Sequence, residues 1–164
     1  MKLEEAVDRA RELEEVGDIL EGGGFLCSAY IMLDRDEEGC LDVWNLAFYS
    51  KKENEITAVE VSEDGAKLGV TDAPLREDTG EVKYRDLGVD AREGMEMARE
   101  VLENDFGVKY RKMLFSLKSE DGKQVWRAVF VGRGLSIITV SIDTETCEVL
   151  EKERKSMGKG MFGG

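Results

Sequence analysis

The stretch VWRAVF at residues 125–130 is the clearest strand signal in the sequence. Trp126, Ala128 and Phe130 occupy alternate positions, and alternate residues of a strand point to one face of its sheet. The stretch VWNLAF at residues 43–48 repeats a tryptophan that is followed four residues later by a phenylalanine. Because the chain has only two tryptophans, this match indicates a duplicated building block.

Other segments recur in the same order around these two stretches. AVDRAREL at residues 6–13 resembles GMEMAREV at residues 94–101, and AVEV at residues 58–61 resembles TVSI at residues 139–142. We therefore predict an α+β fold class, with two tandem repeats that are each a helix followed by an antiparallel sheet. The predicted parts are a first repeat at 1–70, a linker at 71–88, a second repeat at 89–151 and a flexible tail rich in Gly, Met and Lys at 152–164.

Hydrophobic periodicity places the elements within each repeat. Apolar residues three and four apart form one stripe over residues 3–16 and another over residues 94–106, which predicts one helix in each repeat. Asp90 with Glu93 has the spacing of a helix N-cap, and glycines at 22–24 and 107 are expected to end the two helices. The predicted strands are 25–33, 43–50, 55–62, 66–70, 108–118, 124–132, 135–143 and 147–151.

Composition limits the classes of function. The chain has 164 residues, 41% of them hydrophobic, and a formal net charge of −13, so it can build a core and should repel nucleic acid. It has no histidine, which removes the commonest general base and transition-metal ligand. The three cysteines form no CxxC pair, so we expect reduced thiols. With no signal-peptide pattern and no apolar run of about 20 residues, we expect a cytoplasmic protein that does not bind membranes.

One pattern in the second repeat is similar to a known family. WRAVF at residues 126–130, followed by VSIDTETCEVL at residues 140–150, resembles the end of a PepSY domain, where an aromatic strand precedes a strand with an acidic turn. Residues 59–68 match the same pattern more loosely. The resemblance implies a cystatin-like fold and a role in binding or restraining peptidases. The tandem architecture is also similar in shape to the β-lactamase inhibitor proteins, which grip a partner with a sheet face.

Two further motifs have a functional and a simpler interpretation. Residues 34–45 place carboxylates and a glycine much as an EF-hand calcium loop does, but the twelfth position is Asn45 rather than glutamate and both flanks are strand-like. We therefore favour a solvated hairpin tip and expect no metal site. Gly163 and Gly164 at the end resemble the diglycine of ubiquitin-like modifiers. In those proteins two strands precede the helix, whereas here the predicted helix comes first, so we favour a frayed tail.

Four residues are the candidate partner-binding residues: Trp44, Tyr49, Trp126 and Arg127. Aromatic and arginine side chains dominate the binding energy of many protein interfaces. The two tryptophans have an alternative interpretation, which is that each packs under its own helix as part of the core.

The predicted function is a non-enzymatic protein-binding or regulatory module, of a peptidase-inhibitor kind if the family resemblance holds. The partner would be another protein or peptide, or a second copy of the chain, recognised through a sheet surface or an edge strand. The alternative is a small-ligand-binding protein or an enzyme that uses the hollow between helix and sheet, where Asp143 and Glu60 supply carboxylates. We identify no catalytic residues, because no nucleophile has a partner base, and we expect no cofactor.

Overall fold

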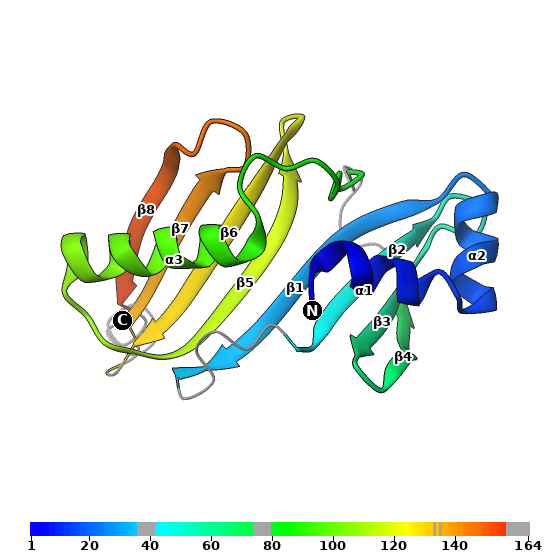
Figure 1. Cartoon of the computed structure of the whole chain (residues 1–164), viewed down its shortest axis with the longest axis horizontal. Coiled ribbons are helices and arrows are strands. Elements are labelled where there is room, and N and C mark those ends of the chain that lie inside the picture. Colours follow the sequence, from blue (N-terminus) through cyan, green and yellow to red (C-terminus); the bar gives the residue numbers. More distant parts are fainter. Residues whose placement is uncertain (36–41, 74–79, 133, 135, 157–164) are drawn as a thin grey trace, which may run out of the picture. The chain divides into compact units, whose positions relative to one another are not determined.

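A computed structural model describes residues 1–35, 42–73, 80–132, 134 and 136–156 of the chain (Figure 1). In order, its elements are α1 (Leu3–Ala10), α2 (Glu14–Glu21), β1 (Phe25–Asp34), β2 (Trp44–Ser50), β3 (Glu55–Ser62), β4 (Gly65–Asp72), α3 (Ala91–Val101), the π-helical turn η2 (Leu102–Phe106), β5 (Tyr110–Glu120), β6 (Lys123–Gly132), β7 (Ser136–Asp143) and β8 (Val149–Ser156). Each strand lies where the sequence predicts one, with ends that differ by a few residues. Residues 152–156, expected in the tail, belong to β8.

The predicted fold class is wrong. The eight strands form one sheet in the order β4-β3-β2-β1-β5-β6-β7-β8, and the protein is mostly β rather than α+β with two tandem helix-plus-sheet repeats. All the pairings with a determined register are antiparallel, as in β1 with β2 and β6 with β7. Periodicity identifies a strand and the face that it buries, but it does not say which strand edges pair with one another. That missing information is the source of the error.

The chain divides into two compact units. Unit 1 comprises Met1–Ile31, Leu41–Asp86 and Leu117–Gln124, and unit 2 comprises Met32–Cys40, Leu87–Ser116 and Val125–Gly164.

In unit 1, two helices cover one face of the strands. α1 contacts β2, β3 and β4, and α2 contacts β2 (Figure 1). The apolar stripe over residues 3–16 predicted one helix, but the helix is broken at Leu13, whose φ of −72° and ψ of 131° are extended. The buried members of the stripe still face the strands, because the second helix resumes with Val16 buried.

In unit 2, α3 covers the face that Trp126, Ala128 and Phe130 share, and all three are buried. The predicted N-cap is confirmed, because the Asp90 carboxylate accepts a hydrogen bond from the backbone N–H of Glu93 at 2.9 Å. The predicted stop is confirmed as well: the helical segment ends at Gly107, which adopts a left-handed φ of 60°.

Each tryptophan holds the chain just before a helix. The Trp126 indole Nε1–H donates to the carbonyl of Val89 at 2.8 Å, two residues before α3 begins. The Trp44 indole donates to the carbonyl of Met1 at 3.1 Å, two residues before α1. Relative exposures of 1% and 0% confirm that both rings pack in the core. In each case the indole fills the core and also satisfies a backbone carbonyl.

The packing of α3 on Trp126 predicts opposite outcomes for two helical glycines. A Cβ at Gly94 would lie 3.0 Å from the Trp126 ring and 3.1 Å from the Phe115 ring, and these two rings are stacked with centroids 4.9 Å apart. Because neither buried ring can move aside, we expect Gly94→Ala to lower the free energy of unfolding by about 1–3 kcal/mol, measured by urea denaturation.

Gly17 in α2 is the matched control. A Cβ there would meet nothing closer than a backbone oxygen at 4.0 Å, so Gly17→Ala should stabilise the protein by about 0.5–1 kcal/mol through helix propensity alone. Equal stabilisation by both substitutions would show that α3 does not press on Trp126.

Candidate interaction surface

Helices cover one face of the unit 1 strands, so the residues that alternate with the core form a second, uncovered face. We call this set the unit-1 open face; it comprises Phe25, Ser28, Tyr30, Asn45, Ala47, Tyr49, Ile56, Ala58, Glu60, Lys67 and Asp72. All of these residues are half-buried or exposed. The face therefore offers side chains to a partner without opening the core.

The strand register arranges the unit-1 open face in three rows that cross the strands. The first row is Phe25, Tyr49, Ile56 and Asp72; the second is Ser28, Ala47 and Ala58; the third is Tyr30, Asn45, Glu60 and Lys67. The middle row continues to β4, where a Cβ at Gly69 would lie 3.3 Å from the Ala58 Cβ. A floor of small side chains thus lies between two rows that each contain a tyrosine.

Tyr49 is fixed at both ends of its side chain. Its ring packs on Phe25 with centroids 5.4 Å apart and planes tilted by 46°. Its hydroxyl donates to the Asn54 side-chain oxygen at 2.8 Å, and Asn54 sits in the β2–β3 turn with a φ of 53°. Fixed geometry lowers the entropy that an aromatic anchor loses when it binds.

Tyr30 is the more accessible of the two tyrosines, with 37% of its surface exposed. Tyr30 is paired with Asn45 of β2. Val43, which directly precedes β2, is 42% exposed. We did not single out Tyr30 or Phe25 from the sequence. The alternation within β1 could have identified Tyr30, but a β-bulge between Leu26 and Ser28 changes which positions share its face.

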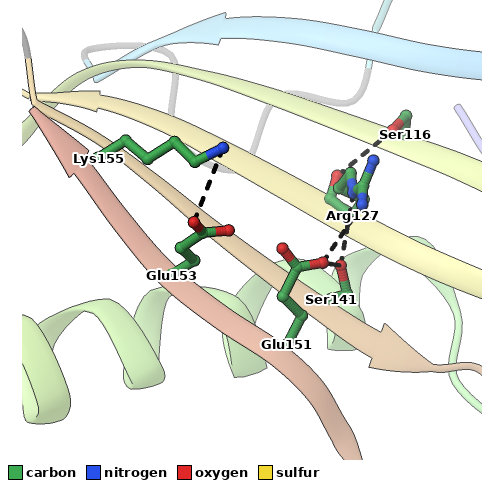
Figure 2. Close-up of polar contacts among 6 residues, drawn as sticks. All are labelled: Ser116, Arg127, Ser141, Glu151, Glu153 and Lys155. Atoms are coloured by element: carbon green, nitrogen blue, oxygen red, sulfur yellow. Dashed lines mark hydrogen bonds and ion pairs between the residues drawn. The ribbon is translucent and has the colours of Figure 1, made fainter. Parts of the chain in front are cut away.

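Arg127 lies on the uncovered face of unit 2, within a row of polar side chains that Figure 2 shows across β5–β8. Its guanidinium contacts the Glu151 carboxylate at 3.3 Å and donates from Nε to the Ser141 hydroxyl at 3.5 Å. The register explains the row, because Arg127 is opposite Ser141 and Ser141 is opposite Glu151. The Ser116 hydroxyl donates to the Arg127 carbonyl at 3.5 Å.

The chemistry of this row is that of a neutral cross-strand network. The charge of Arg127 is balanced by Glu151, and the Ser141 hydroxyl donates to the same carboxylate at 3.5 Å, which the ion pair with Arg127 already engages. A serine becomes a nucleophile only with a base positioned to take its proton. Cross-strand pairs of this kind stabilise a sheet.

The four candidate residues of the sequence therefore do not form one site. Trp44 and Trp126 are buried and present no surface to a partner, because their rings are core side chains. Tyr49 lies on the unit-1 open face, and Arg127 lies on the uncovered face of unit 2. Among them, Tyr49 has neighbours suited to binding a partner.

Half of the calcium-like stretch, residues 36–41, lies outside the described residues. Its last position, Asn45, lies in strand β2. Across residues 1–35, 42–73, 80–132, 134 and 136–156, no three His, Cys, Asp or Glu side chains are grouped as metal ligands.

The terminal diglycine also lies outside the described residues. In the same described part of the chain, none of the helices is long and apolar enough to cross a membrane.

Cys27 is a half-buried thiol at the β1 bulge. Burial raises the pKa of the Cys27 thiol to about 11, and this effect outweighs the hydrogen bond that lowers it. The Sγ donates to the carbonyl of Ala47 at 3.3 Å. Since the thiolate is the nucleophilic form, Cys27 behaves as a core side chain rather than as a reactive group.

Comparison with known proteins identifies a fold and no family. No family model and no curated protein matches the chain, so the PepSY resemblance stays a prediction. One solved structure is similar over 94% of this chain and 93% of its own, with a TM-score of 0.63 and 12% sequence identity: a putative lipoprotein from Clostridium difficile 630. At that identity the similarity extends to the architecture alone.

The two described cysteines should differ in reactivity. Cys147 is exposed, whereas Cys27 carries the raised pKa, so its thiolate fraction at pH 8 is on the order of one in a thousand. We expect iodoacetamide at pH 8 to alkylate Cys147 much faster than Cys27 in the folded protein, as measured by peptide mass mapping over time. In urea the two rates should converge; equal rates in the folded protein would contradict the burial of Cys27.

Proposed function

We propose that this chain is a non-enzymatic binding module that recognises another protein or peptide through the unit-1 open face. The observation that carries the proposal is the arrangement of two partly exposed tyrosines, Tyr30 and Tyr49, on either side of a floor of small side chains. Tyrosine is enriched at protein interfaces because it buries a large apolar ring and keeps a polar hydroxyl.

The floor supports this function by its shape. Ala47 and Ala58 in the middle row do not project as far as the rings in the rows beside them, so a partner's side chains can enter between the tyrosines. Aromatic residues that border a recess commonly act as anchors, while their neighbours exclude water. A binding role requires only this surface.

A role in binding rather than catalysis is supported by the polar groups themselves. Partial burial makes Cys27 a poor nucleophile, and the carboxylate that the Ser141 hydroxyl contacts, Glu151, is already paired with Arg127. A peptidase as the partner, which the PepSY resemblance implies, stays a prediction.

We propose a cytoplasmic location for the protein. Cys27 and Cys147 are free thiols, and free thiols are typical of a reducing compartment. The word lipoprotein describes the structural neighbour, which shares only 12% of its residues with this chain. Recovery of the protein in the membrane fraction of its own cells would contradict this location.

Selection of binding peptides tests the proposed function. Twelve-residue random peptides displayed on phage are selected against the folded protein, and the winners are synthesised and titrated by fluorescence anisotropy. We expect Tyr30→Ala and Tyr49→Ala each to weaken binding at least tenfold, because an interface anchor contributes about 1–3 kcal/mol.

Two further variants separate loss of binding from loss of fold. Ala47→Gln fills the floor with a polar side chain and should also weaken binding, while its circular dichroism stays unchanged. Leu150→Ala removes an exposed apolar side chain of unit 2 and should leave affinity within twofold. Peptides that bind all of the tyrosine variants as well as they bind the original protein would refute the use of this face.

A further inference from the structure

The charges on the unit-1 open face point to the kind of partner. We infer that it binds an extended, positively charged segment of another protein, in which Lys or Arg side chains alternate with apolar ones along the face that the segment presents. This inference rests on the proposed function and adds the chemistry of the partner. It is carried by two carboxylates and two tyrosines that the strand register repeats at the same spacing.

Each tyrosine has a carboxylate two strands away in its own row. Tyr49 on β2 is followed in its row by Ile56 and then by Asp72 on β4. Tyr30 on β1 is followed by Asn45 and then by Glu60 on β3. Neighbouring strands are about 4.8 Å apart, so each carboxylate lies about 10 Å from its tyrosine across the sheet.

Glu60 and Asp72 are exposed, and neither forms an ion pair with any described residue. Among the residues of the unit-1 open face, the positively charged side chain is Lys67, which is opposite Glu60 at the end of the third row. The face therefore keeps a net negative charge, and its carboxylates do not need to break an existing ion pair in order to bind a cation. Breaking such a pair would offset the gain from a new one.

Lys and Arg side chains can interact with both the tyrosine and the carboxylate of a row. Their charged ends pair with carboxylates, and they are attracted to the faces of aromatic rings. In an extended segment, side chains two residues apart share a face, so an apolar side chain two residues from each cationic one would rest on the floor of Ala47 and Ala58. A segment with alternating character can thus satisfy a tyrosine, the floor and a carboxylate together.

Long-range electrostatics favour the same partner. The chain carries a net charge of −13, and the residues of unit 1 account for most of it. Such a field speeds the approach of a basic partner and slows that of an acidic one. A second copy of the chain would bring like charges together, which makes it a poor occupant of this face.

The experiment uses two synthetic peptides of eight residues, Arg-Ser-Val-Ser-Arg-Ser-Val-Ser and the same peptide with Glu in place of each Arg, because side chains two residues apart share a face of an extended segment. We expect the Arg peptide to bind the full chain in 50 mM NaCl and to bind at least fivefold more weakly in 300 mM, because salt screens exposed charges. We expect the Glu peptide not to bind. Equal binding of both peptides would overturn the inference.

Matched double variants separate this face from the bulk charge of the protein. Glu60→Gln with Asp72→Asn removes two carboxylates from the face, and we expect the Arg peptide to bind it at least fivefold more weakly. Glu12→Gln with Glu15→Gln removes the same charge from exposed positions on the helical side of unit 1, and affinity should stay within twofold. Equal losses in both double variants would overturn the inference in favour of non-specific attraction.

The phage-selected peptides distinguish failure of this inference from failure of the proposed function. If the selected peptides need Tyr30 and Tyr49 but carry no excess of Lys and Arg, the face binds partners and the charge inference is wrong. Peptides that need neither tyrosine would refute both. A molar mass above that of the monomer by light scattering, which returns to the monomer value in Tyr49→Ala, would identify a second copy as the occupant. That result would also overturn the inference.

Discussion

The hydrogen bond from each buried indole to a backbone carbonyl links the start of a helix to the strand face that the helix covers. Trp126 binds the carbonyl of Val89 and Trp44 binds that of Met1, in both cases two residues ahead of a helix. A buried indole N–H without an acceptor costs free energy, which favours a chain path that brings a carbonyl next to each tryptophan at the start of its helix. Once the helices are held on that side, the alternate residues of the same strands are left for solvent or for a partner.

The binding surface of unit 1 is thus a consequence of core packing. The same alternation that buries Trp44, Leu46 and Phe48 places Asn45, Ala47 and Tyr49 on the other face. Strand pairing then brings Tyr49 next to Phe25 and Ile56. In unit 2 the same geometry gives a different result, because Arg127 is placed opposite Ser141 and next to Glu151 in a network that neutralises its charge.

How far the sequence could be interpreted depended on whether a feature was local. The eight strands, the Asp90 cap and the stop at Gly107 follow from neighbouring residues and were predicted. The break at Leu13 was missed because the apolar stripe continues through it and the helix resumes in phase. Of the candidate site residues, Tyr49 was identified, but Tyr30 was not, because the bulge in β1 shifts the pattern of faces.

By itself, the sequence determined the strands, which residues share a face of each strand, and the strong negative charge, because periodicity and composition are properties of the chain. Only the tertiary structure decided that the strands join in one sheet rather than in two repeats, since edge pairing depends on backbone groups that every residue carries alike. It also decided that the tryptophans are core residues and that Tyr30, Tyr49, Glu60 and Asp72 share a face. These residues come from four different strands, and only their register brings them together.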